Sequence, residues 1–84
     1  MEIADWRKKI DALESELILL LNKRATYALE IGKIKKIKNL PVLDSKRESE
    51  ILESVANKNE GPLSKESIKT IFSVIMQETR KVEK

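Results

Sequence analysis

The sequence predicts an all-α fold, with one long and two shorter helices per chain, paired with a second copy as a helical homodimer. Apolar residues recur at spacings of three and four through most of the 84 residues, which is the period of an α-helix. Breaks around Pro41 and around Gly61-Pro62 divide this pattern. No stretch alternates as a strand does, and no segment repeats. We therefore expect a single domain, residues 1–84, with helices over residues 2–37, 44–57 and 64–83.

The first predicted helix carries a seam of apolar residues along one face. The seam consists of Ile3, Trp6, Ile10, Leu13, Leu17, Leu20, Tyr27, Ile31 and Ile34. A helix of about 35 residues is about 50 Å long, and a chain this short has too little other structure to cover it. The seam therefore predicts pairing with the same helix of a second chain. The helix must end before Pro41, which cannot continue it.

The two shorter helices have caps and apolar stripes of their own. Asp44 or Ser45 caps the second helix, and Ser64 caps the third. The stripe of the second helix is Ile51, Leu52, Val55 and Ala56, and that of the third is Ile68, Ile71, Phe72, Ile75 and Met76, continuing to Thr79, Val82 and Glu83.

Composition removes several classes of function. The absence of Cys and His excludes disulfides, thiol chemistry, zinc sites with Cys or His ligands, and catalysis by histidine. No apolar run approaches the ~20 residues that span a bilayer, and residues 1–5 lack the plan of a signal peptide. We expect a soluble cytoplasmic protein without a membrane partner. A net charge of +3 from charges of both signs does not by itself indicate nucleic acid.

Two cations lie on the inward face of the long helix. Arg24 interrupts the seam, and Lys35 follows about 16 Å further along the axis, within about 20° of the same face. Their side chains can lean together over Ala28, Ile31 and Gly32 and hold a small anion. The alternative is that both extend to solvent, with their stems covering apolar surface.

Arg7 lies about 42 Å from Lys35 along the same helix, so one helix cannot bring both to one small ligand. In an antiparallel pair of long helices that cross near residue 19, Arg7 of one chain lies opposite residues 30–32 of the other. The dimer would then contain two identical sites, each completed by the partner's Arg7. The alternative is that Arg7 is a solvated charge.

The start of the second helix adds further candidates. Arg47 and Glu48 lie one turn before its apolar stripe and extend that stripe inward. For Glu48 an alternative is open, because the segment from Ser45 to Glu48 fits a capping box in which Glu48 bonds back to Ser45. Asp44 is likewise explained as a cap.

Thr79 and Glu83 lie one turn apart at the end of the third helix, and the alternative for them is a frayed, solvated terminus. The sequence has no nucleophile–base pair, no glycine-rich phosphate loop and no metal cluster. Arginines, a lysine, carboxylates and a hydroxyl suit the binding of a small dianion with a polar group. They also suit chemistry driven by placement and charge rather than covalent attack.

These residues, in their order and spacing, resemble the all-α (AroQ-class) chorismate mutases over essentially the whole chain. The matching segments are Arg7-Lys8-Lys9-Ile10-Asp11-Ala12-Leu13-Glu14, Leu20-Leu21-Asn22-Lys23-Arg24, Ile31-Gly32-Lys33-Ile34-Lys35, Leu40-Pro41-Val42-Leu43-Asp44-Ser45-Lys46-Arg47-Glu48, Asn59-Glu60-Gly61-Pro62-Leu63 and Ile71-Phe72.

The resemblance implies an intertwined homodimer that converts chorismate to prephenate by a 3,3-sigmatropic rearrangement, on the route to Phe and Tyr, with no metal or cofactor. It implies that Arg7 of one chain and Arg24 of the other bind the substrate carboxylates. Lys35 then faces the enolpyruvyl side and stabilises the charge that develops on the ether oxygen. Arg24 and Lys35, together with Glu48 and Glu83, are thus expected to be catalytic as well as substrate-binding.

The resemblance also assigns the remaining candidates. Arg47 and Glu48 open the second helix, and Glu48 takes the ring hydroxyl with help from the Asp44 backbone. Thr79 supplies a small hydroxyl, and Glu83 is the second donor to the ether oxygen. Many members have Gln at that last position, and an ionised Glu has no proton to donate. We therefore expect activity to decline as pH rises, and Glu83→Gln to flatten the profile.

Three other functions stay open at this point. An isochorismate pyruvate-lyase of the same fold would share the helices and the anion-binding residues. A helical nucleic-acid binder could use Lys33, Lys35, Lys36 and Lys38, although these occupy several helix faces rather than one. A dimerisation module would have no activity. Arg24→Ala separates the two, because it should abolish turnover and leave a folded dimer if the residue serves a site.

Overall fold

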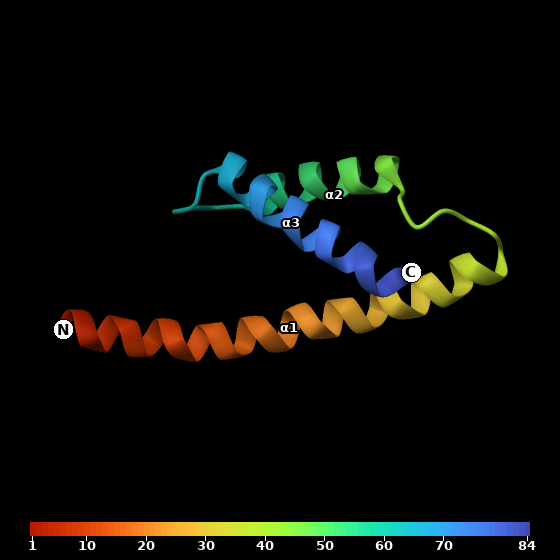
Figure 1. Cartoon of the computed structure of the whole chain (residues 1–84). Coiled ribbons are helices and arrows are strands. Elements are labelled where there is room, and N and C mark those ends of the chain that lie inside the picture. The colour runs from red at the N-terminus through yellow and green to blue at the C-terminus, as the bar shows by residue number, and fades with distance from the viewer.

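The computed structural model describes residues 1–84 and consists of three helices without a strand (Figure 1). Helix α1 spans Ile3–Ile37, α2 spans Ser45–Lys58 and α3 spans Lys65–Glu83. Each helix begins and ends within one residue of the range expected from the sequence. The predicted all-α class, with one long and two shorter helices, is confirmed.

The two ends of α1 are satisfied by local hydrogen bonds. At the start, the Glu2 backbone N–H donates to the Asp5 carboxylate over 2.8 Å. At the end, Asn39 has a left-handed φ of 56°, and the Leu40 N–H donates to the Lys35 carbonyl over 2.8 Å. This closing turn satisfies a carbonyl that the last helical turn leaves free. α1 therefore ends before Pro41 is reached.

α3 packs against both other helices, whereas α1 and α2 do not pack against each other. Figure 1 shows α2 and α3 on one side of α1, with the N-terminal half of α1 extending alone. The molecule is accordingly elongated, with extents of 55 × 23 × 15 Å. Only 5 of 84 residues are buried, so a single chain contains little core of its own.

The apolar seam is uncovered along the N-terminal half of α1. Trp6, Ile10, Leu13, Leu17 and Leu20 are each more than half exposed. A continuous exposed apolar surface of this kind marks an interaction surface. It is the surface that pairing with a second chain would bury, and the homodimer stays a prediction. None of the helices combines the length and apolarity that crossing a bilayer requires.

Candidate active site

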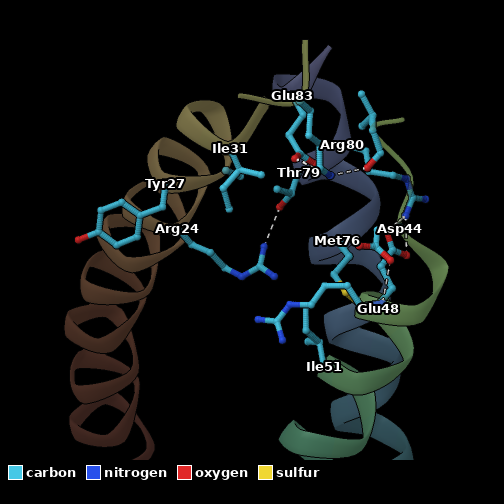
Figure 2. A pocket seen from close by; sticks show the side chains of 14 residues that line it. Arg24, Tyr27, Ile31, Asp44, Glu48, Ile51, Met76, Thr79, Arg80 and Glu83 are labelled. Carbon is cyan, nitrogen blue, oxygen red and sulfur yellow. Dashed lines mark hydrogen bonds and ion pairs between the residues drawn. The ribbon is translucent and has the colours of Figure 1, made fainter. Parts of the chain in front are cut away.

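A cavity of about 320 Å³ opens between the helices, and Figure 2 shows side chains from all three of them turned towards it. It is lined by Arg24, Tyr27, Ala28, Ile31, Lys35, Val42, Asp44, Arg47, Glu48, Ile51, Met76, Thr79, Arg80 and Glu83. The lining includes all of the predicted site residues except Arg7. Residues up to 59 positions apart, Arg24 and Glu83, thus meet in one place.

Arg24 reaches across the cavity from α1 to α3. Its Nη1 donates to the Thr79 hydroxyl oxygen over 3.0 Å, and Figure 2 shows this bond crossing the opening. The Thr79 hydroxyl in turn donates its only proton to the Ile75 carbonyl over 2.6 Å. The hydroxyl oxygen therefore faces Arg24 as an acceptor. Arg24 is part-buried on the cavity wall, so the alternative of a solvent-extended side chain is wrong.

Lys35 is held at the cavity wall by two partners. Its Nζ donates to the Val42 carbonyl over 2.9 Å and lies 3.3 Å from the Glu83 carboxylate. The side chains of Lys35 and Glu83 are only 17% and 9% exposed. Neither a solvated Lys35 nor a frayed Glu83 is therefore observed. Since an ammonium carries three N–H donors, one donor of Lys35 is left for a ligand.

Asp44, rather than Ser45, caps α2, and this changes the position of Glu48. The Asp44 carboxylate accepts from the Arg47 backbone N–H over 3.0 Å, so Ser45 is the first helical residue. With Asp44 as the N-cap, Arg47 occupies the N3 position and Glu48 follows it at N4, whereas a capping box needs its acidic residue at N3. The capping-box alternative is therefore wrong, and the Glu48 carboxylate is available to other partners.

The Glu48 carboxylate pairs with Arg80, a residue that we did not single out from the sequence. Arg80 Nη1 lies 2.7 Å from one Glu48 carboxylate oxygen and 2.5 Å from the other. The signal was present in the sequence, because Arg80 follows Met76 by four residues and so continues the inward stripe of α3. Glu48 and Arg80 are 25% and 30% exposed, so this pair links α2 to α3 at the edge of the cavity.

Arg47 and Arg7 are less constrained. Arg47 lines the cavity, but its side chain is 66% exposed and its guanidinium lies 4.0 Å from Glu50, a weak surface pair. Arg7 is exposed on the free half of α1 and does not line the cavity of its own chain. The geometry of one chain thus agrees with the expectation that a single helix cannot bring Arg7 and Lys35 together.

The charge around the cavity favours an anion. The cations in the lining are Arg24, Lys35, Arg47 and Arg80, and the carboxylates are Asp44, Glu48 and Glu83. With all of them ionised the lining carries one net positive charge. Every buried polar side-chain atom has a hydrogen-bond partner. No cluster of three metal-ligating side chains occurs.

The fold is all-α, and the cavity between its helices is lined by four cations and three carboxylates. The sequence matches the family model of chorismate mutase type II over residues 6–84, and the chain belongs to this family. The resemblance seen in the sequence is confirmed.

Curated relatives and solved structures agree with this assignment. The chain is 36% identical over 87 residues to a bifunctional chorismate mutase/prephenate dehydratase of Aquifex aeolicus, covering 99% of the chain and 24% of that protein. The corresponding protein of Escherichia coli K12 is 34% identical over 74 residues, which cover 87% of the chain and 19% of that protein. The chain thus spans about a quarter or less of these relatives.

Among solved structures, chorismate mutase form II of Thermus thermophilus superposes with a TM-score of 0.94 at 33% identity, covering 96% of this chain and 92% of that one. Chorismate mutase of Helicobacter pylori in complex with prephenate has a TM-score of 0.88 at 33% identity, covering 96% of this chain and 88% of that one.

Proposed function

We propose that the chain converts chorismate to prephenate by a cofactor-free 3,3-sigmatropic rearrangement. The observation that carries this proposal is the position of Lys35. Two protein partners hold its ammonium group at the wall of the cavity, and one of its N–H donors remains free. Chorismate has two carboxylates, a ring hydroxyl and an ether oxygen. The cavity offers groups of matching chemistry on all three helices. Family membership over residues 6–84 supports the same activity.

The proposed mechanism needs no proton transfer. One carbon–carbon bond forms while the ether carbon–oxygen bond breaks, and the atoms of the substrate all remain in the product. Arginines that hold both carboxylates favour the conformer in which the reacting carbons meet. As the bond breaks, negative charge grows on the ether oxygen. Lys35, and Glu83 when its carboxyl carries a proton to donate, then bind the transition state more strongly than the ground state.

In this proposal Arg24 binds one substrate carboxylate, with Thr79 holding the guanidinium in place. Glu48 accepts from the ring hydroxyl, and the Asp44 backbone helps at the same end. Arg47, whose side chain is largely exposed, turns inward to the second anionic end when substrate binds.

We propose that the active form is a homodimer in which the partner's Arg7 completes each site. The uncovered seam of α1 supports pairing, because it exposes five large apolar side chains in succession (Trp6, Ile10, Leu13, Leu17 and Leu20). Charge also supports it. The lining of one chain has four cations and three carboxylates, so the partner's Arg7 would add one positive charge and strengthen the attraction of a dianion. A cytoplasmic location stays a prediction, which cell fractionation would test.

The test is to supply the purified protein with chorismate and, separately, with isochorismate, and to identify the product by mass. We expect prephenate from chorismate. Pyruvate released from isochorismate, with chorismate left unchanged, would instead identify a lyase of the same fold. Recovery of both substrates unchanged, from a protein shown to be folded and dimeric, would contradict an enzymatic function.

A further inference from the structure

Arg80 lies beside Glu48, and both residues line the cavity. Its Nη1 contacts both oxygens of the Glu48 carboxylate, at 2.7 and 2.5 Å. Both side chains are mostly buried, at 30% and 25% exposure, which strengthens the pair relative to a fully solvated one. The contact joins α2 to α3 and leaves the carboxylate in the cavity lining.

A carboxylate in this cavity poses an electrostatic problem. A dianionic ligand would be repelled by Glu48 unless the charge of Glu48 were offset locally. Arg80 supplies that offset directly. A carboxylate has about four lone-pair positions, and the contact with one nitrogen leaves positions free. Glu48 therefore stays able to accept a hydrogen bond from a hydroxyl on the ligand.

We propose that Arg80 is a positioning residue that holds Glu48 in place and offsets its charge, and so makes the site discriminate in favour of ligands with a ring hydroxyl. This inference rests on the proposed function, because it takes chorismate and prephenate as the ligands. Without Arg80, three rotatable side-chain bonds and a net repulsion would take Glu48 away from the hydroxyl.

The experiment compares the affinities of prephenate and of an analogue in which hydrogen replaces the ring hydroxyl, by isothermal titration calorimetry. We expect the native protein to prefer prephenate about 10- to 100-fold, as for a hydrogen bond to a charged group. In Arg80→Met the preference falls to about threefold or less. Arg80→Lys restores most of it, because a single nitrogen makes both contacts.

The matched control is Lys69→Met. Lys69 is also a cation on α3 paired with a carboxylate on α2, at 3.2 Å from Glu53, but it does not line the cavity. Its replacement should leave the preference unchanged. A purely structural role for Arg80 would weaken both ligands equally and would leave the preference intact in Arg80→Met.

Each outcome bears on one proposal or the other. If the native protein converts chorismate and Arg80→Met keeps the native preference, the role of Arg80 is wrong while the proposed function stands. If the native protein neither converts chorismate nor binds prephenate, the proposed function fails and this inference with it. Should Arg80→Met not fold, Arg80→Gln replaces it. The amide retains a donor without the charge, and an unchanged preference in that folded variant also overturns the proposal.

Discussion

The backbone of Glu83 lies directly against Gly32. A Cβ atom at Gly32 would come within 2.8 Å of the Glu83 carbonyl oxygen and 2.9 Å of its Cα. Only a residue without a side chain allows the last turn of α3 to approach α1 this closely. The approach buries Glu83, which is 8% exposed, and places its carboxylate 3.3 Å from the Lys35 ammonium. The contact between Gly32 and the Glu83 backbone thus places the side chains of Lys35 and Glu83 together in the cavity lining, although Gly32 itself does not line the cavity.

We expect Gly32→Ala to lower chorismate turnover at least about tenfold, because α3 must shift and carry Glu83 with it. Alanine gains about 1 kcal/mol in helix propensity, whereas overpacking costs about 1–3 kcal/mol. The net loss in unfolding free energy is therefore about 0–2 kcal/mol, so the protein should stay folded while its turnover falls. Thermal unfolding and steady-state kinetics measure the two.

The control for that variant is Gly61→Ala. Gly61 has a φ of 87° and open space around its Cβ direction, so alanine there strains the backbone by about 1–2 kcal/mol without touching the site. It should lower the melting temperature and leave turnover unchanged. Equal loss of turnover in both variants would show that Gly32 acts only through stability.

Glu83→Gln should flatten the dependence of activity on pH. An ionised carboxylate has no proton for the ether oxygen, whereas an amide donates at every pH. The native activity should therefore decline as pH rises, and the variant should retain its activity over the same range. Profiles of kcat/KM from about pH 4 to about pH 9 make the comparison. Superimposable profiles would remove Glu83 from the reacting centre.

Arg24→Ala should reduce turnover about 100- to 1,000-fold, the typical loss when one stabilising donor is removed from an active site. The dimer should stay folded, because Arg24 contributes one part-buried hydrogen bond to Thr79. Lys33→Ala is the matched control, since its pair with Glu30 is 62% exposed on each side. Sedimentation and chorismate turnover are measured on both variants. An Arg24→Ala variant with native turnover would show that Arg24 does not serve the active site.

Leu17→Glu should produce an inactive monomer. Leu17 lies in the middle of the exposed seam and is itself 54% exposed in the single chain, so a charge there costs little until the partner helix covers it. Ser15→Glu introduces the same charge on the opposite face of α1 and should leave a dimer. Size-exclusion chromatography with light scattering separates the two masses. A dimeric Leu17→Glu protein would show that the seam is not the interface.

Helical periodicity was enough to predict much of the cavity. Arg24 and Lys35 were recognised because they occupy the inward face of one helix, and that relationship depends only on sequence spacing. Thr79 and Glu83 were found in the same way on α3. The contact between Gly32 and Glu83 could not be predicted from helical periodicity, because it depends on how α1 and α3 cross.

The pair of Glu48 with Arg80 shows a second limit of sequence patterns. Asp44 and Ser45 are both good caps, and a shift of one residue between them decides whether Glu48 caps its own helix or faces α3. The sequence pattern also could not identify Arg80 as the partner of Glu48. The two residues are 32 positions apart, and it is the angle between α2 and α3 that brings them together. Arg7 illustrates a related limit, because the residues that it is expected to join, Arg24 and Lys35, lie on another chain.

The central claim is that each site is shared between two chains, and mixing two inactive variants tests it most directly. Arg7→Ala and Arg24→Ala are each denatured, combined in equal amounts and refolded together, and chorismate turnover is then measured. Half of the refolded dimers contain one chain of each kind, and one of the two sites in each has both arginines. We therefore predict recovery of about one quarter of the native activity. Activity no higher than the average of the two separately refolded variants would contradict a shared site.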